Sequence, residues 1–245
     1  MKKTIMLITC VVSALCLTAQ AALPNNAKLS LDKNNIKVWT YKDASNPVLS
    51  YKAETTLDIP IEKAVALILD VNNTSKWVPN VAKAELLSRD DKKGEFLIYM
   101  VLDFPFPLKD RDMVVKGKMS KDSQGVITIK NFAIQQGKAL NSNYIRLKDY
   151  SGDWTFQKLA ANQVKVITSG HANPEGSIPS SVTNMLVEQQ PYQMLQKMKV
   201  ELAKNNKLPA LPSNIREDIT FSSLSPSTGG FVTCANNCLK YKYSI

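Results

Sequence analysis

A single change in hydrophobic period near Pro179 constrains the fold of this chain more than any other feature. Between residues 36 and 172, apolar and polar residues alternate in short segments, which is typical of strands with one buried face. From Pro179 to about Asn205 the apolar residues recur every three or four positions, the spacing of one helix face. Pro191 lies inside this run and removes a backbone donor, so we expect a bend or break near it.

Turn residues divide the alternating region into separate strands, and one short helix interrupts it. Pro60 opens this helix, which ends near 70–73, and a short helical or irregular bridge covers 74–79. Residues 22–35 are polar and asparagine-rich and are expected to form a loose lead-in. The predicted strands cover residues 36–41, 49–57, 81–90, 95–103, 110–120, 126–135, 144–159 and 163–172.

An antiparallel sheet with one apolar face has to bury that face against another layer. The helix predicted over 179–205 is the only predicted element long enough to cover it. The expected fold class is therefore α+β of the helix-grip type, in which a curved antiparallel sheet is covered by a long C-terminal helix. A space between helix and sheet is expected, although periodicity alone does not distinguish a cavity from a filled core.

The first 21 residues have the features of a secretory signal peptide. Lys2 and Lys3 precede an uncharged apolar run, and Ala19 and Ala21 place small residues where a signal peptidase cleaves. The apolar run is shorter than the ~20 residues that a spanning helix needs. We therefore predict cleavage after Ala21 and export, in a bacterium, to the periplasm; the alternative is a retained N-terminal anchor.

Without this signal peptide, 224 of the 245 residues remain, which suits one domain. We predict that this domain covers 22–207 and that 208–245 form a flexible tail. The tail contains Cys234 and Cys238, for which an intramolecular disulfide is the default in an oxidising compartment. Pairing between two chains is the alternative.

The charge balance favours anionic partners. The formal net charge is +10, and +8 once Lys2 and Lys3 are removed. Such a charge suits transient contact with an anionic membrane surface, or serves solubility alone. Nucleic acid is not an expected partner of an exported protein. Trp77 and the 104–107 loop could form an entrance that touches the membrane, or could fold back onto the protein.

Three segments carry a resemblance to a known family. They are Phe104–Val114, which contains Asp-Arg-Asp after two prolines, Gly152–Phe156 with its Gly-x-Trp pattern, and Asn173–Pro179 with Gly-Ser-Ile-Pro. Their order and spacing resemble the START (steroidogenic acute regulatory protein-related lipid transfer) domain, especially its bacterial exported branch, over about 36–205. Glu175 stands where that family usually has a glycine. The resemblance implies a deep apolar cavity for one lipid, sterol or similar molecule, and no catalysis.

The candidate ligand-binding residues are those expected to face the space between sheet and helix. They are Arg111, Met113, Val115, Trp154, Phe156, Thr168, Met185 and Gln189. Arg111 could hold a carboxylate, phosphate or hydroxyl of the ligand, or form a structural ion pair with a neighbouring aspartate. Gln189 could orient a headgroup or lie in water at the edge of the helix face. Trp154 and Phe156 could instead be ordinary sheet core.

No catalytic residue, metal site or cofactor is predicted. The only histidine, His171, has the strand parity of the outer face, away from any pocket, so a nucleophilic site that uses it is not expected. With a single histidine in the chain, a Cys/His zinc site is not expected either. Two alternatives to a lipid binder stay open. One is a cyclase- or hydratase-like enzyme that uses Arg111 and an aspartate as acid–base groups, and the other is an envelope protein that acts through protein contacts alone.

Overall fold

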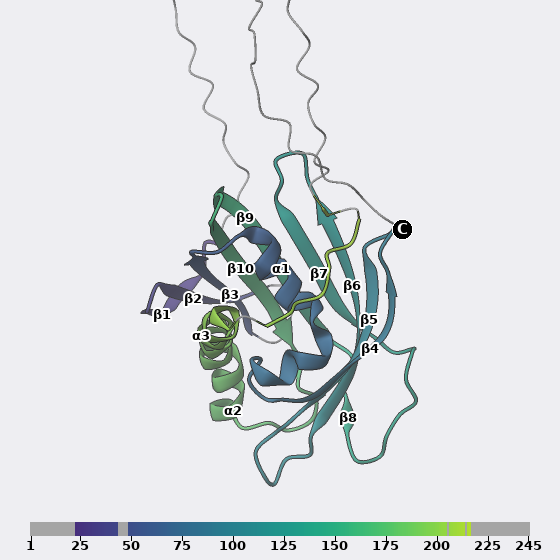
Figure 1. Cartoon of the computed structure of the whole chain (residues 1–245). Helices are drawn as coiled ribbons and strands as arrows, with labels where there is room; N and C mark the ends of the chain where they lie inside the picture. The colour runs from purple at the N-terminus through teal and green to yellow at the C-terminus, as the bar shows by residue number, and fades with distance from the viewer. Residues whose placement is uncertain (1–22, 44–48, 205, 214, 217–245) are drawn as a thin grey trace, which may run out of the picture.

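The computed structural model describes residues 23–43, 49–204, 206–213, and 215–216. The predicted signal peptide and the two cysteines of the tail lie outside the described residues. Figure 1 shows a strongly curved sheet with helices on its concave face. None of the described helices is long and apolar enough to cross a membrane.

The sheet has the order β1-β2-β3-β10-β9-β7-β6-β5-β4, and neighbours along this path pair antiparallel. The short β8 pairs with β6 in parallel, off this path. The strands are β1 (Lys28–Lys33), β2 (Ile36–Lys42), β3 (Leu49–Leu57), β4 (Val81–Asp90), β5 (Glu95–Leu102), β6 (Arg111–Lys121), β7 (Ile127–Ile134), β8 (Ile145–Arg146), β9 (Tyr150–Ala160) and β10 (Gln163–Ala172). The α+β helix-grip prediction is confirmed.

Two strand predictions are wrong in detail. The region expected to be a loose lead-in contains β1, which pairs with β2 through a turn at Asn34 and Asn35. Both asparagines have positive φ angles of 55° and 57°, which suit a tight two-residue hairpin. The single strand expected over 144–159 is two strands, β8 and β9, because the chain leaves β6 before it turns into β9.

The C-terminal helix is interrupted at the place that Pro191 predicts. It consists of α2 (Ser180–Asn184), a π-helical turn (Met185–Gln189) and α3 (Gln190–Ala203). A proline ring clashes with the carbonyl four residues earlier, here that of Val187, and a wider π turn relieves such a clash. A π turn holds about one residue more than an α turn, so it also shifts which residues face the sheet.

Helices cover two parts of the concave face. Helix α1 (Ile61–Leu69) packs against β9 and β10, and α3 packs against β2 and β3. A 3-10 helix (Val71–Lys76) follows α1 and ends at Trp77, which is buried. The main core cluster joins both helices to the sheet, with Phe156, Leu195 and Met198 fully buried.

The folded unit extends beyond the predicted boundary at 207. Leu211 and Ile215 are buried in the main core cluster, Ile215 with 2% of its surface exposed. Arg89 donates a hydrogen bond to the carbonyl of Ala210 at 3.0 Å, and Lys121 donates one to the carbonyl of Ile215 at 3.4 Å. We call residues 208–216 the C-terminal strap. The predicted flexible tail therefore begins too early, because the strap has its own apolar anchors.

Candidate ligand-binding site

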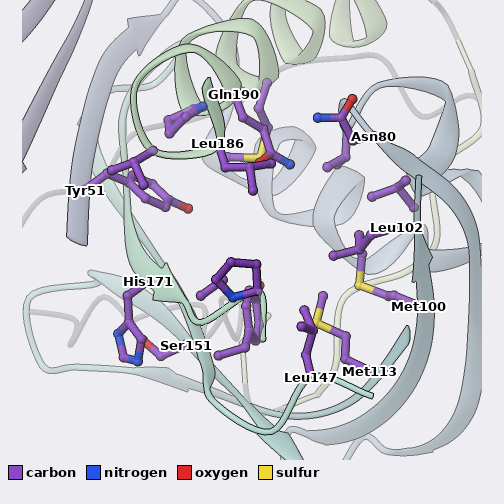
Figure 2. Close-up of a pocket in the computed structure, with 18 of the residues that line it drawn as sticks. Tyr51, Asn80, Met100, Leu102, Met113, Leu147, Ser151, His171, Leu186 and Gln190 are labelled. Atoms are coloured by element: carbon purple, nitrogen blue, oxygen red, sulfur yellow. The ribbon is translucent and has the colours of Figure 1, made fainter. Parts of the chain in front are cut away.

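A cavity lies between the sheet and the C-terminal helix, bounded by the π turn and the start of α3 (Figure 2). Its wall is formed mostly by apolar side chains from β3, β5, β6, the ends of β9 and β10, and the helical segment. The lining residues are Leu49, Tyr51, Val78, Asn80, Val81, Met100, Leu102, Phe104, Met113, Leu147, Tyr150, Ser151, His171, Ala172, Pro174, Leu186, Val187, Gln190, Pro191 and Met194.

The cavity is modest in size. It offers about 130 Å³ to the centres of water-sized molecules, within about 880 Å³ of open space that includes its mouth. One water needs ~10–15 Å³ by the first measure, so the inner space matches on the order of ten waters. An apolar molecule of that size fits without rearrangement, whereas a long-chain lipid needs the walls to move apart.

Among the described residues, no aspartate, glutamate, lysine or arginine lines this cavity. Its polar groups are the phenols of Tyr51 and Tyr150 and the side chains of Asn80, Gln190 and Ser151. Transfer of an ion into such surroundings is costly unless a partner compensates its charge. The cavity is therefore suited to uncharged, mainly apolar matter, with a few neutral hydrogen-bonding groups.

The two tyrosines of the wall stay protonated. Burial raises the pKa of Tyr51, and a hydrogen bond with Thr168 partly offsets that effect. Burial likewise raises the pKa of Tyr150, with smaller contributions from Tyr51 and Asp153. Both phenols are therefore neutral hydrogen-bonding groups at any physiological pH.

The structure brings one predicted residue, Met113, into the cavity wall. Val115 lies behind it in the same apolar cluster, two positions further along β6. Trp154 and Phe156 face the same side of the sheet but pack deeper, in the main core, where their rings stack with centroids 6.2 Å apart. Thr168 is buried and contacts Tyr51 instead of open space. Strand parity predicts the correct face of the sheet. Trp154, Phe156 and Thr168 are nevertheless core side chains outside the cavity wall.

Arg111 is buried but does not present its charge to the cavity. Its guanidinium donates to the main-chain carbonyls of Lys109, Pro174 and Glu175, with Nε 3.0 Å from the Pro174 oxygen. The guanidinium carbon also lies 4.1 Å from the centre of the Phe104 ring. Neither of the expected roles, an ion pair or a ligand contact, is observed. Arg111 instead ties the start of β6 to the loop that precedes α2.

The residues predicted on the helix are displaced by the π turn. Gln189 is exposed, and its neighbour Gln190 lines the cavity and donates to the carbonyl of Pro79 at 3.1 Å. Of the two alternatives for Gln189, the exposed position is the one observed, because the π turn breaks the period of 3.6 residues. Met185 falls in the π turn, and its side chain is outside the described part of the structure.

His171 forms part of the wall at the end of β10, contrary to the expectation that it lies away from any pocket. Its imidazole points outward from the cavity, as the strand parity predicts (Figure 2). There its Nε2 lies 2.8 Å from Oδ1 of Asp149. Ser151 lies directly opposite His171 on β9, but no hydrogen bond joins the two in the described structure. This arrangement lacks the serine–histidine contact of a nucleophilic site.

A buried ion pair on the other face of β6 was missed by the sequence analysis. Arg146 donates to both oxygens of Asp112, at 2.8 and 2.9 Å, and the Tyr99 hydroxyl donates to Asp112 at 3.0 Å. Burial, followed by the bond to Asp112, raises the pKa of Tyr99 to about 12. Arg146 also donates to the carbonyls of Lys138 and Ala139, so the pair fixes the β7–β8 loop.

The fold and the cavity define a helix-grip protein with an enclosed apolar site. The chain matches the family model of the START domain over residues 9–208, and it belongs to this family. An uncharacterized protein of Pseudomonas aeruginosa is 25% identical over 191 residues, which are 78% of this chain and 94% of that protein. The phosphatidylcholine transfer protein of Rattus norvegicus is 26% identical over 163 residues, 64% of this chain and 74% of that protein.

Solved structures agree with this assignment. The STAR-related lipid transfer protein of Xanthomonas axonopodis, solved as fragment 25–204, superposes with a TM-score of 0.68 at 29% identity. The match covers 74% of this chain and all of that fragment. Human StAR-related lipid transfer protein 5 has a TM-score of 0.64 at 14% identity, covering 73% of this chain and 87% of that one, which shows the shared fold.

Proposed function

We propose that this protein binds one lipid or similar hydrophobic molecule in the cavity beneath its C-terminal helix and carries it without chemical change. The observation that carries this proposal is a mainly apolar cavity wall inside a START fold, whose described lining residues include no aspartate, glutamate, lysine or arginine. The names of its relatives, a phosphatidylcholine transfer protein and a STAR-related lipid transfer protein, support the same class of ligand. The proposal includes the periplasm of a bacterium as the site of this activity, on the basis of the predicted signal peptide.

The geometry favours a carrier over an enzyme. The enzyme alternative needs Arg111 as an acid–base group, but its guanidinium is engaged with three carbonyl oxygens. Desolvation lowers the pKa of Arg111, yet a guanidinium remains charged throughout the physiological range. His171 is turned away from the cavity toward Asp149. Neither Arg111 nor His171 therefore aims an acid–base group into this cavity.

Ligand exchange at an anionic membrane surface is part of the proposal. Phe106, at the tip of the β5–β6 loop, is 97% exposed, and Leu140, in the β7–β8 loop, is 78% exposed. Lys109 joins the loops by donating to the carbonyl of Ser142 at 3.5 Å. Figure 1 shows both loops at the end of the sheet where α2 lies. Trp77, the other expected entrance residue, is buried and plays no such part.

Native mass spectrometry of the full-length protein, purified gently from cells, tests the carrier function. We expect a co-purified lipid in the wild type and little in Ala172→Trp, which fills the cavity from its wall. Leu159→Trp, on an exposed strand position, is the matched control and should keep the lipid. A wild type that takes up no lipid from cells or vesicles would refute the proposal. Turnover of a polyketide or aromatic substrate would favour the enzyme alternative.

A further inference from the structure

Three glycines, Gly170, Gly152 and Gly117, lie in one row across the concave face of the sheet, and we call it the glycine row. Backbone pairing aligns Tyr51 with Gly170, Gly170 with Gly152, Asn131 with Gly117, and Gly117 with Phe96. Asn131 completes the row by donating from Nδ2 to the carbonyl of Gly152 at 2.6 Å. The row therefore runs from β3, where Tyr51 lines the cavity, to Phe96 on β5.

Aromatic side chains occupy the space beside two of these glycines, whereas the β9 backbone lies against Gly170. A Cβ atom placed on Gly117 would lie 2.1 Å from the Phe96 ring, and one on Gly152 would lie 2.2 Å from the Tyr150 oxygen. Tyr150 is itself a wall residue of the cavity. Movement of these two rings toward the helix would extend the cavity over the row, because the glycines there have no side chains to fill the space.

The backbone pairing between β7 and β9 is interrupted at the same place. The pairing of β7 with β9 runs from Ile127 to Ile129, stops at Lys130 and Asn131, and resumes at Phe132. At the interruption the Asn131 backbone N–H donates to the carboxylate of Asp153, on the other face, and its side chain bridges to Gly152. Asn131 thus replaces a missing pair of backbone bonds, and its amide orientation is fixed by the carbonyl it must donate to.

Among the residues that the structure describes, two buried side-chain polar atoms have no hydrogen-bond partner, and one of them belongs to this row. One is Oδ1 of Asn131, a residue with 8% of its surface exposed, and the other is Nε1 of Trp77, with 2% exposed. Oδ1 lies 2.7 Å from the Cβ position of Gly117, over the row. Buried polar atoms are nearly always paired, so this unpaired acceptor, on a side chain bonded to Gly152 next to the wall residue Tyr150, points to a donor from a ligand.

We propose that the glycine row is the deep end of the lipid site, and that it receives an uncharged polar group, a hydroxyl or an amide N–H, which donates to Oδ1 of Asn131. This inference rests on the proposed carrier function and specifies the ligand's polar end. Within the described part of the chain, neither the row nor the cavity wall contains an aspartate, glutamate, lysine or arginine, so a buried phosphate or ammonium would lack an oppositely charged partner there. The neutral Tyr150 phenol supplies a second hydrogen-bonding group over Gly152, on the β9 side of Asn131.

A matched pair of neutral lipids tests this with the full mature chain. Dioleoylglycerol has one free hydroxyl, and its 3-acetyl ester lacks that hydroxyl but keeps both chains. Each is offered in neutral vesicles, and the lipid bound to re-isolated protein is quantified by mass spectrometry. We expect the wild type to prefer dioleoylglycerol by about tenfold, the scale of one buried hydrogen bond. Asn131→Leu should bind both lipids about equally, and Asn131→Gln is the conservative comparison.

The outcomes separate this inference from the carrier function. Equal binding of the two lipids by the wild type overturns the deep hydroxyl site and leaves the carrier function standing. Selective uptake of dioleoylphosphatidylcholine or dioleoylphosphatidylglycerol, offered in parallel, overturns the inference that the site prefers an uncharged headgroup. It also leaves the carrier function standing. Binding of none of the four overturns both. Because the wild-type comparison needs no substitution, the test holds even if Asn131→Leu fails to fold.

Discussion

Arg146 and Asp112 form a two-pronged ion pair, 2.8 and 2.9 Å long, buried on the face of β6 opposite the cavity. Arg111, the residue next to Asp112, points to the other face and holds the loop before α2. Two successive residues therefore fix two different loops, one on each side of the sheet. This arrangement explains why the Asp-Arg-Asp segment matters to the fold although it does not contact the cavity with its charges.

Arg146→Met should lower the free energy of unfolding by about 3–5 kcal/mol, because Asp112 would keep a buried, uncompensated charge. The double variant Arg146→Met/Asp112→Asn should recover part of that loss. Denaturant titration measures both changes. Lys93→Met, which breaks the exposed pair with Asp90, is the matched control and should cost less than ~1 kcal/mol. A loss equally small for Arg146→Met would show that the pair is dispensable.

Tyr99 makes the stability sensitive to alkaline pH. Its pKa is raised to about 12 in the folded protein, so between pH ~10 and 12 the unfolded chain loses this proton while the folded chain keeps it. Stability therefore falls as pH rises through that window, by at most ~1.4 kcal/mol per pH unit from this group. Tyr99→Phe should flatten the fall in urea-unfolding curves measured from pH 9 to 12. An identical pH dependence in Tyr99→Phe would contradict the assignment.

The sequence predicts the faces of the elements better than their depth. Alternation on β9 puts Tyr150, Trp154 and Phe156 on one face, and the structure confirms this. Alternation contains no signal for where helix α1 ends and open space begins. The sequence prediction of the site therefore includes Trp154 and Phe156 and omits Tyr150. Depth depends on which helix lies above each position, which is a long-range property.

Two other errors have physical causes of the same kind. Pro191 indicates an interruption of the helix, but not that the interruption is a π turn, which moves Gln190 into the place expected for Gln189. Arg111 finds its partners 63 and 64 residues away, at the carbonyls of Pro174 and Glu175. Main-chain acceptors leave no trace in residue type, so a search for acidic partners could not identify them.

The C-terminal strap should contribute to stability. Truncation after Lys207 removes the buried side chains of Leu211 and Ile215, and Ile215→Ala alone should cost about 2–4 kcal/mol. Thermal and chemical unfolding of the truncated and full mature chains would measure this. Replacing Cys234 and Cys238 by serine is the companion test. It should change stability by less than ~1 kcal/mol, because a bridge across so short a loop constrains the unfolded chain little. Full stability of the 22–207 fragment would support the domain boundary at 207 that the sequence predicts.

Arg111→Lys should destabilise the protein and speed the release of bound lipid. A lysine ammonium keeps the charge but lacks the planar fork that reaches three carbonyls, so the loop of Pro174 and Glu175 loosens beside the cavity. We expect a loss of about 2–3 kcal/mol, on the scale of bonds to a charged donor. A drop in lipid affinity with unchanged stability would instead show that Arg111 contacts the ligand.

The exposed loop tips should control the rate of lipid exchange with membranes and not the affinity for lipid. Phe106 and Leu140 lie outside the cavity wall, so Phe106→Asp/Leu140→Asp should leave the amount of co-purified lipid unchanged. The same variant should transfer fluorescent lipid between anionic vesicles at least several-fold more slowly, because two apolar contacts are lost and two negative charges face the membrane. Phe132→Asp, at another exposed apolar position on β7, is the matched control. Added salt should slow the wild type on anionic vesicles, since it screens lysines such as Lys109. Equal transfer rates for the wild type and the loop variant would mean that lipid exchange proceeds without this contact.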